Sequence, residues 1–177
     1  MPATPRTFML QCHPATPCAA VQALAASVAP APGGGWRLIF ALAGELARLR
    51  IPAPAARPAA ADGLWRHTCL EAFVGEPRGT RYHEFNFSPS GDWAAYPFAA
   101  ERQRDPAAEP LPPPRIACTH DARSLRLDAW LPAAYNGWHL GLAAVVEATD
   151  GSLSYFALAH PREVPDFHQR AGWTTNL

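Results

Sequence analysis

Residues 81–98, RYHEFNFSPSGDWAAYPF, contain the pattern from which the fold prediction starts. Successive side chains of a β-strand point to opposite faces, so a strand over residues 81–87 places Tyr82, Glu84 and Asn86 on one face. A solvated strand face ordinarily carries Lys, Thr or Ser, whereas this one carries an aromatic ring, a carboxylate and an amide. The stretch therefore predicts a strand, followed by a Ser-Pro-Ser-Gly turn, whose polar face does more than contact water.

Other parts of the chain show the same alternation of apolar and polar residues, which is typical of strands. The Asp-Gly pair at 150–151 predicts a tight hairpin turn. Residues 18–29 are rich in Ala, which favours a helix, but their short length and their neighbours favour a strand. We expect further strands in residues 18–29, 36–42, 68–77, 124–131, 139–148 and 152–160.

Two Pro-rich segments, residues 51–63 and 105–115, interrupt these strands. Proline lacks the backbone N–H that a sheet needs and fixes φ, so both segments are predicted to be surface loops. A chain of 177 residues suits one domain covering residues 1–177. Many short strands separated by turns predict an all-β fold, an antiparallel β-sandwich of the jelly-roll or immunoglobulin-like type.

The composition excludes several classes of partner. All 15 basic residues are Arg and they are balanced by 15 acidic residues, with no basic cluster, which argues against a nucleic-acid partner. The N-terminal residues lack a signal-peptide pattern, and no apolar run approaches the roughly 18 residues that span a bilayer, so we expect a cytoplasmic protein without a membrane partner. The four Cys form no CxxC pair and are expected to be reduced thiols.

The first candidate site lies in residues 64–73, LWRHTCLEAF. On a strand, Glu71 shares a face with Cys69 and Phe73, so a carboxylate is flanked by two less polar groups. A buried carboxylate requires an ion pair or hydrogen bonds. Two interpretations follow: a structural ion pair with an Arg, or a ligand-contacting acid beside Trp65.

The second candidate site is the polar face of residues 81–87. Glu84 and Asn86 could form a buried network that fixes the strand register, or they could bind the hydroxyl groups of a sugar. In the second case Trp93 or Tyr96 would supply the apolar platform for a sugar ring. Arg102 is the nearest cation in the sequence to pair with Glu71 or Glu84, and its planar guanidinium suits a carboxylate or vicinal oxygens.

The third candidate site comprises His160, Asp166 and His168, spaced as H-x5-D-x-H. Asp-x-His on a strand would point both side chains in the same direction. Three interpretations are open: the Asp orients a His, the residues contact a ligand, or they bind a metal. The spacing matches no strict metal-binding motif, so no metal is predicted.

Catalytic motifs are mostly absent: the sequence has no nucleophile elbow, no phosphate-binding glycine loop and no HExxH. Glu71 with Glu84 could form the acid and base of a hydrolase, since glycosidases use such a carboxyl pair. Carboxylates of this kind more often serve structure or binding, so the leading prediction is a protein without catalytic activity.

The combined motifs LWRHTCLEAFV, YHEFNFSPSGDWAAYPF, ER, FALAHP and PDFH resemble the bacterial DOMON-like family, related to the family 9 carbohydrate-binding modules. The resemblance covers most of the chain from Trp36 onward and implies an antiparallel β-sandwich. It also implies that Trp65 and Glu71 face a sugar and that Arg102 contacts it. Some DOMON relatives bind haem through Met and His, but Met9 matches no haem-ligating motif, so no cofactor is expected.

The leading functional prediction is a non-catalytic domain that binds a small ligand, most simply a carbohydrate or sugar derivative. A protein-interaction or structural sandwich and a hydrolase that uses Glu71 and Glu84 are the alternatives. The residues predicted to contact the ligand are Trp65, Glu71, Tyr82, Glu84, Asn86, Trp93, Arg102, His160, Asp166 and His168.

Overall fold

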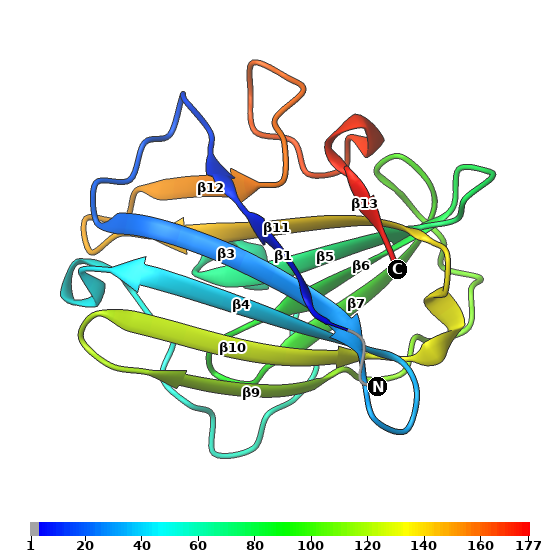
Figure 1. The fold of residues 1–177 in the computed structure, drawn as a ribbon, viewed down its shortest axis with the longest axis horizontal. Coiled ribbons are helices and arrows are strands. Elements are labelled where there is room, and N and C mark those ends of the chain that lie inside the picture. Colours follow the sequence, from blue (N-terminus) through cyan, green and yellow to red (C-terminus); the bar gives the residue numbers. More distant parts are fainter. Residues whose placement is uncertain (1–3) are drawn as a thin grey trace.

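Two antiparallel β-sheets pack face to face in a computed structural model that describes residues 4–177 (Figure 1). The first sheet has the strand order β1-β3-β4-β10-β9. Its strands are β1 (Arg6–Met9), β3 (Val21–Pro30), β4 (Trp36–Gly44), β9 (Arg115–His120) and β10 (Ser124–Leu131). The predicted β-sandwich is therefore confirmed.

The second sheet has the order β2-β12-β11-β5-β6-β7-β8, and β13 pairs with the end of β11. Its strands are β2 (Gln11–Cys12), β5 (Cys69–Gly75), β6 (Tyr82–Phe87), β7 (Trp93–Ala100), β8 (Gln103–Arg104), β11 (His139–Glu147), β12 (Leu153–Ala157) and β13 (Thr175–Asn176). Short 3-10 helices occupy four connections: η1 (Leu46–Arg48), η2 (Leu64–Arg66), η3 (Ala133–Tyr135) and η4 (Arg170–Gly172). No helix in residues 4–177 is long and apolar enough to cross a membrane.

The main core lies between the two sheets and follows the period of two in the sequence. Phe40 of β4 and Leu127 of β10 enter it from the first sheet, and Phe85 and Phe87 of β6 enter it from the second. All four side chains are fully buried. Tyr82, Glu84 and Asn86 share one face of β6, as predicted, and because Phe85 and Phe87 point inward this is the outer face of the second sheet.

Most of the predicted strands are present, including β3 in the Ala-rich residues 18–29. The Asp-Gly hairpin joins β11 to β12, with Gly151 at a positive φ of 87°. The strand predicted over 152–160 was too long, because β12 ends at Ala157 and His160 lies in the loop that follows. The Pro-rich segment 51–63 contains no strand, only an isolated bridge.

The outer face of the second sheet carries a second apolar cluster, which the chain covers with residues 158–174, here called the 158–174 segment. Trp173 of this segment packs on Phe73 and Tyr82. It lies so close to Gly75 and Gly141 that a Cβ at either position would collide with its indole ring. The Trp173 indole N–H also donates a hydrogen bond to the Phe167 carbonyl (2.9 Å), which ties the segment to itself.

Candidate functional site

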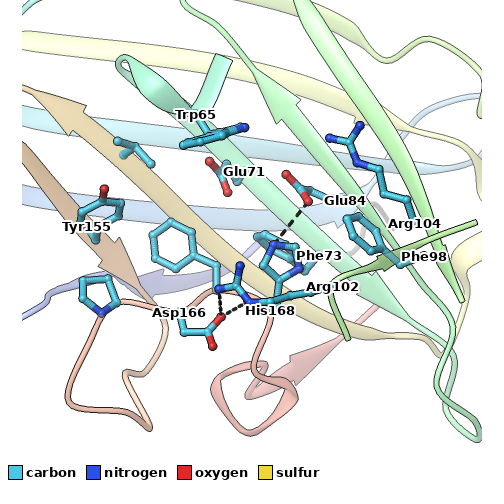
Figure 2. A pocket seen from close by; sticks show the side chains of 13 residues that line it. Trp65, Glu71, Phe73, Glu84, Phe98, Arg102, Arg104, Tyr155, Asp166 and His168 are labelled. Carbon is cyan, nitrogen blue, oxygen red and sulfur yellow. Dashed lines mark hydrogen bonds and ion pairs between the residues drawn. The ribbon is translucent and has the colours of Figure 1, made fainter. Parts of the chain in front are cut away.

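A pocket of about 570 Å³ lies on the outer face of the second sheet, beside the 158–174 segment (Figure 2). Its volume is within the range of small-molecule sites, roughly 300–1,000 Å³. Aromatic side chains make up much of its wall, and several charged groups converge within it. The lining residues are Trp65, Glu71, Phe73, Glu84, Phe98, Arg102, Arg104, Val145, Tyr155, Pro165, Asp166, Phe167 and His168.

Two buried acids on neighbouring strands line this pocket. Glu71 of β5 is directly opposite Asn86 of β6, and Glu84 is two residues before Asn86, so the acids are diagonal neighbours on one face. The Asn86 amide donates to Glu84 Oε1 at 2.7 Å. Glu71 Oε1 is buried and has no hydrogen-bond partner within residues 4–177. The two acids therefore differ: Glu84 accepts a hydrogen bond from Asn86, whereas Glu71 has an acceptor oxygen that no described residue uses.

Burial raises the pKa of Glu71 well above its usual value, and the nearby charge of Glu84 raises it further. Burial also raises the pKa of Glu84, but the hydrogen bond from Asn86 and the positive charges of Arg104 and Arg102 act in the opposite direction. Glu71 is therefore the member of the pair that retains a proton more readily. The interpretation of Glu71 as part of a structural ion pair with an Arg is wrong, because no ion pair among residues 4–177 includes it.

A chain of hydrogen bonds fixes His168 at the edge of the pocket. The backbone N–H of Arg102 donates to the Tyr82 hydroxyl (3.0 Å), which lies 2.7 Å from His168 Nδ1. Burial, followed by the charge of Arg102, lowers the pKa of His168 to about 4, so the ring is neutral near pH 7. A Tyr82 hydroxyl that donates to Nδ1 leaves the proton on Nε2, which faces Glu84 Oε2 at 3.8 Å.

The two Arg of the pocket have different environments. Arg102 has a positive φ of 58° and pairs with Asp166 at 2.8 Å (Figure 2), not with Glu71 or Glu84 as the sequence predicted. Asp166 also pairs with Arg162 at 3.3 Å. Arg104 lies over the Tyr96 ring, 3.7 Å from its centroid. Strained backbone at Arg102 is of the kind that functional sites tend to contain.

The structure brings six of the predicted residues to the pocket and leaves four outside its lining. Trp65, Glu71, Glu84, Arg102, Asp166 and His168 line it. Tyr82 and Asn86 lie behind the lining, where they hold His168 and Glu84 through the hydrogen bonds described above.

Trp93 and His160 are remote from this arrangement. Trp93 pairs with Phe87 across β6 and β7, so it is on the inward side of the sheet and supplies no platform in this pocket. The His160 imidazole donates to the Gln11 carbonyl at 2.7 Å and packs on His13. Asp166 and His168 share the pocket although they lie in a loop and not on the predicted strand.

Sequence reasoning missed Arg104 and most of the aromatic wall. Phe73 could have been found, because it shares the face of Glu71 at a spacing of two. Phe167 and Tyr155 reach the pocket through the path of the 158–174 segment and the position of β12, for which the sequence gives no local signal. Within residues 4–177 no group of three or more His, Cys, Asp or Glu is placed to hold a metal ion.

No family model matches the chain, and no curated protein matches it. Among solved structures, the chain is similar to a "putative carbohydrate-binding protein" from Bacteroides uniformis, with a TM-score of 0.66 and 14% sequence identity. The similarity covers 96% of this chain and 84% of the other. At this identity it shows that the two proteins share a fold.

Proposed function

We propose that this protein binds a carbohydrate or sugar derivative in the pocket, without catalysing a reaction. The observation that carries the proposal is the combination of an aromatic wall with hydrogen-bonding groups that have capacity to spare. A sugar presents an apolar ring face and a rim of hydroxyl groups, so it needs both an aromatic surface and polar partners.

Trp65 is the stacking residue in this proposal. Its side chain lines the pocket and 43% of the residue is exposed, although large aromatic residues are ordinarily buried. Glu71 and Glu84 would accept or donate hydrogen bonds to hydroxyl groups, and Arg102 would donate. The resemblance to the DOMON-like family and the name of the Bacteroides uniformis protein both support a sugar as the ligand.

Isothermal titration calorimetry with a panel of mono- and disaccharides tests the proposal. At least one sugar should bind, and Trp65→Ala should weaken its affinity about tenfold, since aromatic stacking contributes on the order of 1 kcal/mol beyond buried area. Met9→Ala is the matched control, because Met9 is a large exposed side chain on β1 of the other sheet. If Trp65→Ala leaves the sugar affinity unchanged, the sugar binds outside this pocket.

Glycoside hydrolysis is the second candidate function, and the acid pair favours it. Glu71 and Glu84 lie on one face of adjacent strands, and glycosidases use two carboxyl groups at a cleft. Incubation with chromogenic aryl glycosides decides between the two functions. If the wild type releases the phenol and Glu84→Gln does not, the protein is a hydrolase. If a sugar binds and no phenol is released, the result supports a binding domain.

A further inference from the structure

Asp128 and Glu147 are acids buried on outer sheet faces, and each has basic partners in the protein. Asp128 of β10 binds Arg126 at 2.8 Å and also pairs with Arg37. Glu147 of β11 binds Arg50 at 3.0 Å and His67 at 2.8 Å.

Glu71 is as deeply buried as either acid, with 2% of the residue exposed, but in the part of the chain that the structure describes no basic side chain pairs with it and its Oε1 has no hydrogen bond. A buried carboxylate without a cation is strongly unfavourable, and a second acid nearby makes it more so. The missing partner is therefore one that a ligand can supply.

The other charges of the pocket are already matched. Arg102 pairs with Asp166. Arg104 is the cation that most lowers the pKa of Glu84. Two Arg and three acids line the pocket, so an ionised Glu71 gives the lining one more acid than Arg, while Arg162 pairs with Asp166 from outside the lining. An additional cation would neutralise it, whereas an anionic ligand would add to the excess.

The aromatic wall also suits a cation. Phe73, Tyr155 and Phe167 line the pocket together with Trp65. The electron-rich faces of aromatic rings attract organic cations, and this attraction is stronger where water is excluded. An ammonium group also brings several N–H donors for the carboxylate of Glu71, which lines the pocket.

On the basis of the proposed sugar-binding function, we propose that the ligand is an amino sugar, whose protonated amine binds Glu71 while its hydroxyl groups contact Glu84 and Arg102. Charge on Glu71 is unfavourable in the free pocket and favourable once the amine is bound. Binding of the amine therefore favours loss of a proton from Glu71, because burial and Glu84 favour the protonated form in the free pocket.

The proton displacement gives the site a defined pH dependence. The charged and titratable groups that line the pocket with Glu71 are Glu84, Arg102, Arg104, Tyr155, Asp166 and His168, and Cys69 lies on the same strand face. Burial and Glu84 raise the pKa of Glu71, so at low pH the amine must compete with a tightly held proton. Affinity for an amino sugar should rise from pH 5 to pH 7, while affinity for the parent hexose stays level.

Calorimetric titration of the whole protein tests this assignment. The ligands are glucosamine, galactosamine and mannosamine, and each is compared with its parent hexose and with N-acetylglucosamine. We expect at least one amine to bind about tenfold or more tightly than its parent hexose, because a hydrogen bond to a charged partner exceeds a neutral one. Titrations in buffers of different ionisation enthalpy should show net proton release on binding of the amine and none on binding of the hexose.

Glu71→Gln keeps the shape of the side chain and removes its charge. It should reduce the affinity for the amine at least tenfold, and by a larger factor than the affinity for the parent hexose, because a hydrogen bond to a charged partner exceeds a neutral one. Asp128→Asn is the matched control on the other sheet and should change neither affinity.

Equal affinities for amine and hexose, or an equal loss of both in Glu71→Gln, would overturn the amino-sugar assignment and leave sugar binding intact. Failure of every sugar to bind, with or without an amine, would overturn the proposed function as well.

Discussion

The outer faces of the two sheets use buried acids in opposite ways. On the first sheet, Asp128 lies between Arg37 and Arg126, both of which reach solvent, and the acid is fully paired. On the second sheet, Glu71 is also buried but is surrounded by aromatic rings and a second acid, Glu84. Burial alone therefore does not distinguish a structural acid from a binding acid. The distinction is whether the protein itself supplies the partner.

The largest expected effect contrasts two Trp on these outer faces. Trp173→Ala should lower the free energy of unfolding by about 3–5 kcal/mol, because Trp173 is 7% exposed and packs on Phe73 and Tyr82. Trp130 on the first sheet is only half-buried between Arg37 and Arg115. Trp130→Ala should therefore cost about 1 kcal/mol. Urea denaturation of both variants measures the difference, and equal losses would contradict the view that the second sheet carries an additional core.

The next largest effect on stability contrasts the buried acids Asp128 and Glu71. Asp128→Asn should lower the free energy of unfolding by about 1–2 kcal/mol, a value discounted because its Arg partners are partly exposed. Glu71→Gln should leave it unchanged or raise it, because the replacement removes a group that is costly to ionise. Thermal unfolding of the two variants at pH 7 provides the measurement.

The pH dependence of the Glu71→Gln variant sharpens this contrast. The pKa of Glu71 is raised in the folded protein, so above its ordinary pKa the unfolded chain binds fewer protons and wild-type stability falls as pH rises. The advantage of Glu71→Gln over wild type should therefore grow from pH 5 to pH 8. A constant difference, or a large loss of stability at pH 7, would show that Glu71 has a structural partner after all.

The smallest effect concerns His168. Its pKa is lowered to about 4, and a His depressed in this way contributes stability that is present above the ordinary His pKa and is lost as pH falls towards 4. An NMR titration should show the His168 ring resonances unchanged from pH 8 to about pH 5. Titration of His168 near its ordinary pKa would mean that the 158–174 segment opens readily and exposes the ring.

Alternation along strands was enough to predict which faces meet. It put Glu84 on one face with Tyr82 and Asn86, and Glu71 on one face with Phe73, and the structure shows that both are the outer face of the second sheet. The same rule, applied more strictly, separates Trp93 from Tyr96. They are three residues apart on β7 and so lie on opposite faces.

The pocket itself could not be predicted in this way. Asp166, Phe167 and His168 reach it through a loop whose path depends on where Trp173 docks, and that docking depends on the absence of side chains at Gly75 and Gly141. Arg104 belongs to a two-residue strand with no periodicity to detect. Pairing of Arg102 with Asp166 joins residues 64 positions apart, and no local pattern records such a contact.

The close approach of Trp173 to Gly75 and Gly141 has a consequence for sequence variation. Any side chain on either glycine would displace the indole ring, so neither glycine can change while that ring keeps its place. Among sequences that keep this pocket, we expect glycine at both strand positions wherever the aromatic residue is retained. Replacement of that aromatic residue by a small one should release Gly141, whereas Gly75 also lies against the Arg170 guanidinium and should change only if Arg170 moves or changes as well.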